Sequence, residues 1–404
     1  MASSEVSSAN NIVYQYYNCL ILWRHKFIRE DLWVRNGIIL DPKMLFFDEC
    51  KKPDIRIDCH GLYIVPGFID VQINGGFSVD FSSHENVEEG IQKVAKGLLS
   101  YGVTSFCPTI VTSPRDVYHK MIPRIKIRNG SKDGAGVLGI HVEGPFISKK
   151  KKGAHPEDYI IEPSNGIKTV EDVYGSLECI KMLTIAPELP NASEVIKQLV
   201  QRGIVVSLGH SVGNVLQAEA AVNNGASFIT HLFNAMLPFH HRDPGIVGLL
   251  TSSKIAKNRK IYYGMITDGI HSHPAALRIA HRANPEGLVL VTDAISAMGL
   301  PPGVHKLGQQ SLTISGFTAH LTGTDTLAGS VATMPYCIKH FHKATGCSME
   351  QAIEAATLHP AESLHIDDKK GTLEYRSDAD FVMIDESFKI LKTFIAGEMV
   401  YSCD

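Results

Sequence analysis

Eight short apolar runs recur through the middle of the chain. They are rich in Val and Ile and continuous rather than alternating with polar positions, a pattern typical of strands buried on both faces of a parallel sheet. The runs cover residues 68–73, 103–108, 137–142, 182–186, 205–208, 228–230, 262–267 and 288–292. We therefore expect eight parallel strands.

Amphipathic segments lie between several of these runs. Apolar residues at helical spacing fill residues 87–98, and Gly102 follows as a stop signal. Similar segments cover residues 195–200, 214–223 and 274–282. Alternation of eight strands with helices indicates the α/β class and favours a (β/α)₈ TIM-like barrel over a doubly wound sheet.

The two ends of the chain differ from the middle. Residues 12–64 contain short β-rich pieces with turns at Asn36-Gly37 and Asp41-Pro42, and residues 371–400 contain more short strands. Neither end has enough apolar residues to bury a core alone. We predict a small β-sandwich domain formed by residues 1–64 together with 371–404, and a barrel over residues 65–370.

Composition narrows the possible partners. The 404 residues carry a formal net charge of −3, with 44% hydrophobic and 20% charged residues, so nucleic acid and membrane surfaces are not expected as partners. The eight cysteines are scattered without a Cys-x-x-Cys pair, which is typical of reduced thiols. The chain has no recognisable signal peptide or membrane span, and a cytoplasmic, cytosolic location is expected.

Polar residues stand repeatedly where the predicted strands end, which is where such barrels place their chemistry. The third run leads to His141 and Glu143, the fifth to His210, the sixth to His231 and the last to Asp293. A single histidine at a strand end is usually a hydrogen-bonded structural residue. Repetition around one rim indicates an active site instead.

One carboxylate and two imidazoles, from Glu143, His210 and His231, form a known set for a catalytic divalent ion with an open position for water. His141 shares a strand face with Glu143, so spacing also leaves it open as a ligand. Water on such an ion has a pKa of about 7 and supplies a nucleophile. Asp293 then either moves the proton or orients a histidine ligand.

Two further features suit hydrolysis of a phosphorylated amide. A loop histidine, His155 or His271, is placed to help polarise a carbonyl group. Backbone N–H groups after Asn234 and the guanidinium of Arg242 suit a phosphate, although Arg242 read alone is equally a surface residue.

The motifs form one ordered set: PGFID at 66–70, HVEGPF at 141–146, KGAH at 152–155, GHS at 209–211, THLFNAM at 230–236, DGIH at 268–271, VTDA at 291–294, LAGS at 327–330, GTL at 371–373 and DADFV at 378–382. Together they resemble the N-acetylglucosamine-6-phosphate deacetylases of the amidohydrolase superfamily, particularly the animal members. The resemblance runs from about residue 12 to about residue 400. Each motif alone is weak, but their combination and order are specific.

The resemblance implies hydrolysis of the acetamide of N-acetyl-D-glucosamine 6-phosphate to D-glucosamine 6-phosphate and acetate, in amino-sugar catabolism. It implies one divalent ion per subunit, expected to be Zn²⁺, on Glu143, His210 and His231. Metal-bound water is then the nucleophile and Asp293 the general base and acid. Substrate contacts are implied for Ala154, His155, Asn234, Ala235, Arg242, His271, Leu327, Ala328 and Gly329. A homodimer is expected, with Arg242 acting on the neighbouring subunit's substrate.

One departure from the wider superfamily is informative. Many members carry a His-x-His pair after the first strand for a second metal, but here the positions hold Gln72 and Asn74. No lysine stands out as a bridging ligand, so one metal is expected. Two alternatives are an aminohydrolase acting on a ring amidine, which would not need Arg242, and an inactive barrel scaffold, which would not need the four metal and acid–base residues.

Overall fold

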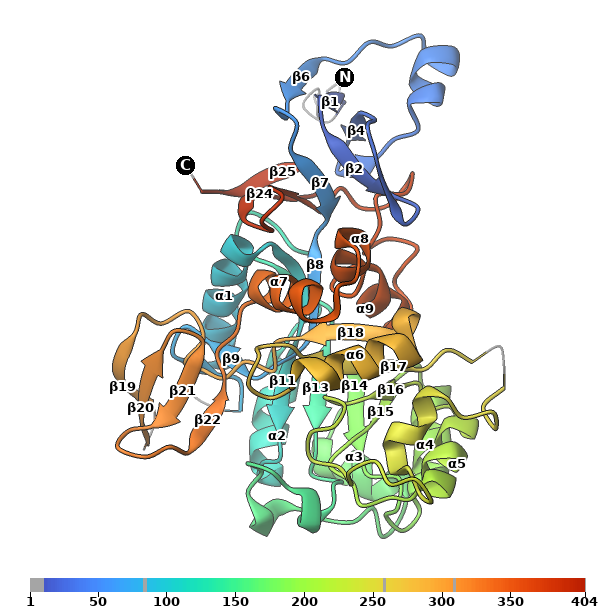
Figure 1. Cartoon of the computed structure of the whole chain (residues 1–404), viewed down its shortest axis with the longest axis vertical. Coiled ribbons are helices and arrows are strands. Elements are labelled where there is room, and N and C mark those ends of the chain that lie inside the picture. Colours follow the sequence, from blue (N-terminus) through green and yellow to red (C-terminus); the bar gives the residue numbers. More distant parts are fainter. Residues whose placement is uncertain (1–10, 83–85, 257–258, 308–309, 404) are drawn as a thin grey trace, which may run out of the picture.

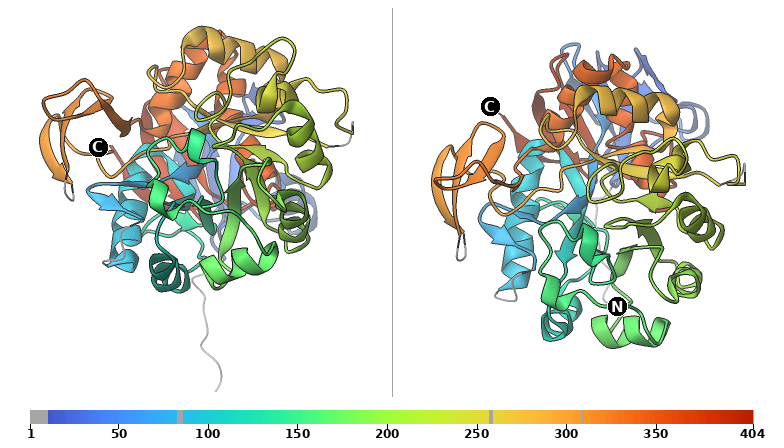
Figure 2. Two further views of the ribbon diagram at one scale, coloured as in Figure 1. Left: turned by 90° about the horizontal axis from the view of Figure 1, so that it is seen from below. Right: turned by 60° about the horizontal axis from the view of Figure 1, so that its bottom comes forward.

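The eight apolar runs form a nearly closed parallel barrel. The computed structural model describes residues 11–82, 86–256, 259–307 and 310–403. Around the barrel the strands follow their order in the chain (Figures 1 and 2): β8 (Phe68–Ile73), β11 (Val103–Val111), β13 (Ile140–Glu143), β14 (Ile180–Ile185), β15 (Val205–Leu208), β16 (Phe228–Ile229), β17 (Tyr262–Ile266) and β18 (Leu288–Val291). The predicted barrel is confirmed.

The predicted run 137–142 is interrupted. Its beginning belongs to a separate strand, β12 (Gly136–Val137), and β13 starts after Gly139. Gly139 has a φ of 128°, and a Cβ there would lie 2.7 Å from the Cβ of Lys181. The close approach of Gly139 to Lys181 therefore requires glycine at the break between β12 and β13.

Helices cover the outside of the barrel and include the four predicted segments. Within α1, the buried side chains Val87, Ile91, Val94 and Leu98 form one face, and Gly102 follows with a left-handed backbone. The helices are α1 (Val87–Leu98), α2 (Arg115–Met121), α3 (Ile167–Tyr174), α4 (Ala192–Gln201), α5 (Val215–Asn223), α6 (Pro274–Ala283), α7 (Met334–Thr345), α8 (Met349–Glu354) and α9 (Leu358–Ser363). Within the described ranges, none is long and apolar enough to cross a membrane.

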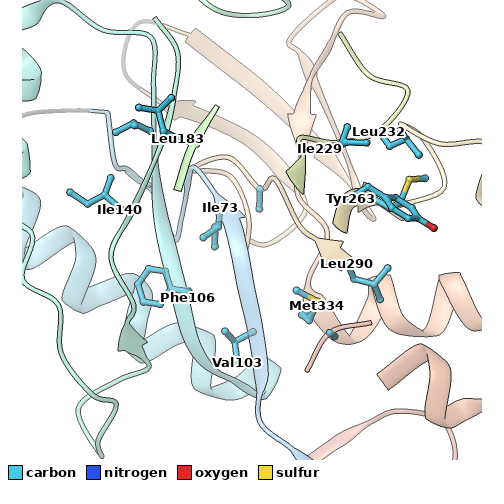
Figure 3. Close-up of a cluster of buried hydrophobic side chains, with 14 of the residues drawn as sticks. Ile73, Val103, Phe106, Ile140, Leu183, Ile229, Leu232, Tyr263, Leu290 and Met334 are labelled. Atoms are coloured by element: carbon cyan, nitrogen blue, oxygen red, sulfur yellow. The ribbon is translucent and has the colours of Figure 1, made fainter. Parts of the chain in front are cut away.

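Several barrel strands divide their side chains between two cores. On β8, Ile69 and Val71 belong to the core inside the barrel, whereas Phe68 and Ile73 belong to the core between strands and helices. Figure 3 shows part of this outer core. The labelled side chains are Ile73, Val103, Phe106, Ile140, Leu183, Ile229, Leu232, Tyr263, Leu290 and Met334. Burial on both sides explains why the runs are continuously apolar.

The first and last strands meet at a seam rather than in a regular ladder. Toward the amino ends of these strands, the backbone N–H of Leu290 donates to the oxygen of Ala355 at 2.8 Å, and that of Ile69 donates to Ala356 at 2.9 Å. The connection between α8 and α9 thus supplies hydrogen-bond partners to both edges, as buried backbone groups require.

The other end of the seam is closed by β8 and β18 themselves. The backbone N–H of Asp293 donates to the oxygen of Gln72 at 2.8 Å. The buried carboxyl group of Asp70 accepts the backbone N–H and the hydroxyl of Thr292. The end of the barrel that carries the site is therefore cross-linked by side chains.

Strands from both termini share one sheet beyond the barrel (Figure 1), in the order β25-β24-β23-β7-β2-β3. A four-stranded sheet, β5-β4-β1-β6, adjoins it, and a common core includes Tyr16, Phe381 and Phe394, with ring centroids of the last two 4.4 Å apart. The strands are β1 (Tyr14–Tyr17), β2 (Leu20–Trp23), β3 (Lys26–Ile28), β4 (Leu32–Arg35), β5 (Ile38–Ile39), β6 (Ile55–Asp58), β7 (Tyr63–Pro66), β23 (Phe381–Ile384), β24 (Ile390–Ile395) and β25 (Glu398–Ser402).

The limits proposed for the two domains stay a prediction. The shared sheet agrees with a unit built from both termini, but the boundaries at 64–65 and 370–371 are not tested by it. The ends of that unit, residues 1–10 and 404, lie outside the described residues.

A small antiparallel sheet is inserted between β18 and α7, and the hydrophobic pattern does not predict it. Its strands are β19 (Gly303–Leu307), β20 (Gln310–Ser315), β21 (Thr318–Leu321) and β22 (Leu327–Ser330), and a short pair, β9 (Gly75–Gly76) and β10 (Val79–Asp80), follows β8. Leu312, Ile314 and Ala319 form a separate core with Ala297. In Figure 1 the inserted sheet stands to one side of the barrel.

Candidate active site

A cavity of about 270 Å³ lies at the carboxyl ends of the barrel strands. It brings together nine of the residues predicted from the sequence: Glu143, Ala154, His155, His210, His231, His271, Asp293, Ala328 and Gly329. The rest of its wall comes from Asn74, Asp80, Val111, Ile295, Ser296 and Ser330. Residues separated by most of the chain thus converge on one cavity.

Three possible metal-ligand atoms form a compact triangle in this cavity. The Nε2 atoms of His210 and His231 each lie 3.0 Å from Oε1 of Glu143, and 3.0 Å from each other. Ligand atoms that bind zinc at about 2.0–2.2 Å lie at comparable separations from one another. The predicted set of one carboxylate and two imidazoles therefore fits a single divalent ion.

The tautomer of His210 and the ionisation of Glu143 support this set. Nδ1 of His210 lies 2.8 Å from the backbone oxygen of Lys151 and must donate to it, which leaves the lone pair on Nε2. Burial opposes ionisation of Glu143 and His231. At Glu143 the hydrogen bonds with His210 and His231 outweigh burial and hold the pKa well below 4.5, and the interaction with Glu143 raises the pKa of His231 to about 9. The cavity thus favours a cation beside Glu143.

His155 also lies close to this centre. Donor atoms of Glu143, His155 and His210 fall within 4.8 Å of one another, so this trio is an alternative set. However, Nδ1 of His155 accepts the backbone N–H of Thr112 at 3.3 Å and lies 2.7 Å from its hydroxyl. Burial lowers the pKa of His155 to about 3, so the ring is neutral and carries its proton on Nε2. We therefore place His231 in the ligand set and His155 as a hydrogen-bond donor.

His141, which spacing left open as a ligand, is engaged elsewhere. Its Nδ1 lies 3.1 Å from the backbone oxygen of Val71 and its Nε2 lies 2.8 Å from Oγ1 of Thr184. Burial lowers its pKa to about 4, so the ring is neutral, with one nitrogen donating and the other accepting. His141 thus has a structural role inside the barrel.

Two side-chain amides hold the carboxylates of the site. Asn74 donates from Nδ2 to Oδ1 of Asp293 at 2.7 Å. Gln72 donates from Nε2 to Oε2 of Glu143 at 3.1 Å and to Oδ1 of Asp293 at 3.3 Å. Burial, together with the charge of Glu143, raises the pKa of Asp293 to about 6. Gln72 and Asn74, noted from the sequence only as missing ligands, therefore orient the predicted proton-transfer group.

His271 is oriented by a carboxylate that the sequence analysis did not single out. Its Nδ1 lies 2.6 Å from Oδ2 of Asp268, while Oδ1 of Asp268 accepts the backbone N–H groups of Ile270 and His271. Burial opposes the charge on His271, but Asp268 outweighs it and raises the pKa of the ring. The other ring nitrogen is left for the cavity. The spacing Asp-x-x-His was the available sequence signal.

Three of the central residues have unusual backbone conformations. His210, His231 and Asp293 have φ values of 47°, 28° and 46°, in the left-handed region that residues other than glycine rarely adopt. Such conformations cost about 1–3 kcal/mol each and concentrate at functional sites. The stability of the barrel therefore offsets this cost and holds the three residues in these conformations.

Four predicted substrate contacts lie outside the cavity wall. Asn234 and Ala235 follow His231 on the same rim, and Leu327 precedes the wall formed by β22. Arg242 is exposed, and among residues 11–82, 86–256, 259–307 and 310–403 its guanidinium has no hydrogen bond or ion pair. A single chain therefore does not place Arg242 in its own cavity.

Comparisons with known proteins show which family the chain resembles over its length. Residues 63–400 match the Amidohydrolase family. The chain is 57% identical to the N-acetylglucosamine-6-phosphate deacetylase of Danio rerio, covering 98% of this chain and 99% of that protein. It is also 57% identical to the deacetylase of Homo sapiens, covering 99% and 98%. A solved structure of a Mycobacterium smegmatis deacetylase mutant in complex with N-acetyl-D-glucosamine-6-phosphate is similar, with a TM-score of 0.80, 27% identity, and coverage of 98% and 100%.

Proposed function

The chain belongs to the amidohydrolase family, and because its relatives over nearly the whole length are N-acetylglucosamine-6-phosphate deacetylases, we propose that it hydrolyses the acetamide of N-acetyl-D-glucosamine 6-phosphate. The products are D-glucosamine 6-phosphate and acetate. The observation that carries this proposal is the meeting of Glu143, His210, His231 and Asp293 in one cavity.

The chain's own residues divide the chemistry. Glu143, His210 and His231 would hold a divalent cation, which would supply Lewis-acid chemistry to the amide carbonyl and to water. Asp293 takes a proton from the attacking water and returns it to the amine nitrogen when the carbon–nitrogen bond breaks. A carboxyl group with a pKa of about 6 suits both directions of transfer near neutral pH. His155 donates a hydrogen bond to the carbonyl oxygen, and His271 binds the sugar.

The cofactor and assembly follow from the same site. Zinc is the proposed ion, one per subunit, because two imidazoles and a carboxylate are a frequent catalytic zinc set. A homodimer is proposed because Arg242 is exposed and outside its own cavity, where it is available to the phosphate bound by a second subunit. A cytosolic location is proposed from the eight free cysteines.

Acetate release from N-acetylglucosamine 6-phosphate by the purified protein tests the function, with metal content measured on the same sample. We expect steady release at about one metal per chain. Chelation should abolish the activity, and zinc should restore it. A fully metallated sample that releases no acetate would overturn the proposal, and release that persists after complete metal removal would overturn the role of the ion.

A further inference from the structure

An aromatic stack attaches the inserted sheet to the barrel. Phe317 lies in the turn between β20 and β21, and its ring stacks on that of Tyr336 in α7, with centroids 3.6 Å apart and planes 20° apart. Tyr336 in turn stacks on His340, with centroids 6.1 Å apart. The turn at Phe317 is therefore fixed to a helix of the barrel.

The same turn is directly connected to the cavity wall. Thr318, next to Phe317, pairs with Ser330 of β22, and Ala319 pairs with Gly329. Ser330 accepts the backbone N–H of Ile295 at 2.9 Å. A Cβ at Gly329 would lie 2.7 Å from Cγ2 of Ile295, so these two residues of the wall are in close contact. The pairing of β21 with β22 therefore connects the turn at Phe317 to the Ala328–Gly329 wall.

Tyr336 also contacts the segment that leads to His271 of the cavity wall. Its hydroxyl donates to the backbone oxygen of Asp268 at 3.5 Å, and a Cβ at Gly269 would lie 2.9 Å from Cε1 of His340. Helix α7 therefore packs directly against the segment in which Asp268 orients His271. One side chain, Tyr336, thus contacts both the turn between β20 and β21 and the segment that orients His271.

The stack is not needed to form the inserted sheet. The sheet has its own core, built from Leu312, Ile314 and Ala319, and the ring of Phe317 is outside it. Phe317 is 38% exposed, unlike these buried side chains. Its contact with Tyr336 therefore fixes where the sheet lies rather than whether it folds.

We propose that Phe317 and Tyr336 are positioning residues for the substrate: their stack sets the distance between the β22 wall and the metal centre, and so the fit of the sugar. This inference rests on the proposed deacetylase function. Neither residue lines the cavity, so both act through Ala328, Gly329 and His271. Their loss should therefore weaken binding of the sugar more than it slows the reaction at the carbonyl carbon.

The test compares KM and kcat for acetate release by wild type, Phe317→Ala, Phe317→Tyr and Tyr336→Leu, with metal content measured for each. An aromatic pair contributes enough that its loss should raise KM by about 3- to 10-fold. We expect kcat to stay within about twofold, because the acid–base group and the metal ligands are untouched. Phe317→Tyr keeps an aromatic ring at this position and should therefore keep the wild-type KM.

Tyr375→Ala is the matched control. Tyr375 is 40% exposed and pairs with Trp23 at 4.8 Å between centroids, but it lies in the terminal β-rich region, outside the cavity wall. Its KM should equal that of wild type. Tyr336→Phe keeps the stack and loses only the hydroxyl, so it reports the contact to Asp268 separately.

A double mutant shows whether the stack acts as a unit. In the combined Phe317→Ala and Tyr336→Leu variant, the rise in KM should be smaller than the product of the two single effects, because both remove one contact. Unchanged KM in Phe317→Ala, a fully multiplicative double mutant, or an equal rise in Tyr375→Ala would each overturn the inference. Absence of acetate release from metallated wild type would instead overturn the proposed function.

Discussion

The seam of the barrel contains a carboxyl group whose ionisation should oppose folding. Asp70 is fully buried and accepts the backbone N–H of Thr292 at 3.3 Å as well as its hydroxyl. Burial outweighs these hydrogen bonds and raises the pKa of Asp70 to about 7. We predict that Asp70→Asn, which keeps the size of the side chain, removes a pH-dependent part of the free energy of unfolding.

The sign and magnitude follow from the two pKa values. The ordinary pKa is about 3.9, so the folded protein binds this proton more tightly than the unfolded chain does. The cost of ionising Asp70 is therefore absent below about pH 4, grows as the pH rises and is complete above about pH 7. It amounts to about 4 kcal/mol in full, of which about 2.5 kcal/mol develops between about pH 5 and pH 8.

Urea unfolding of metal-free wild type and Asp70→Asn at these two pH values measures the effect. The stability of the variant relative to wild type should rise by about 2.5 kcal/mol on going to the higher pH. Asp385→Asn is the control, because hydrogen bonds from Ser387 and Lys389 outweigh burial and lower the pKa of Asp385, leaving it ionised throughout. A stability difference for Asp70→Asn that is the same at both pH values would refute the reasoning.

Three further predictions concern the cavity. Asp293→Asn should keep the fold and the metal but lower kcat by about 10²–10⁴-fold; turnover within a few fold of wild type, at equal metal content, would remove Asp293 from proton transfer. Thr112→Val removes the hydroxyl 2.7 Å from Nδ1 of His155 and should lower kcat/KM for acetate release by about tenfold. An unchanged kcat/KM would mean that the ring of His155 does not need this hydrogen bond. Arg242→Ala should raise KM for the phosphorylated sugar by about 10- to 100-fold. Equal loss with unphosphorylated N-acetylglucosamine would show that Arg242 does not bind phosphate.

The barrel could be predicted because its signals are local. A strand buried on both faces is largely apolar along its length, and β18 (Leu288–Val291) is one such strand. An amphipathic helix such as α1 repeats its apolar face every three or four residues. Asn214, which begins α5 with a capping box to Gln217, is likewise readable from neighbouring residues.

The inserted sheet could not be predicted by the same reasoning. Strand β19 is largely exposed, and its burial pattern reflects one small core rather than two large ones. Only LAGS at 327–330 stood out, and it did so as a family motif rather than as a strand. Short strands with one half-buried face carry a weak hydrophobic signal.

The candidate site, too, could be predicted only in part. The donors at the strand ends could be predicted, since parallel strands place their carboxyl ends on one rim. Which nitrogen of a ring has a free lone pair depends on contacts distant in sequence, such as Thr112 to His155 and Thr184 to His141. The sequence therefore indicated the set of candidates, and three-dimensional hydrogen bonding separated ligands from donors and structural residues.

The seam also constrains how the protein is made. When β18 has left the ribosome, all eight barrel strands have been synthesised. The backbone N–H groups of Ile69 and Leu290 still lack their acceptors, the backbone oxygens of Ala356 and Ala355. Strand β7, which leads into β8, must wait longer for β23. Unpaired strand edges promote aggregation of nascent chains. The segment from α8 to β23, which contributes no predicted catalytic group, thus completes the hydrogen bonds that protect the earlier strands from misassembly.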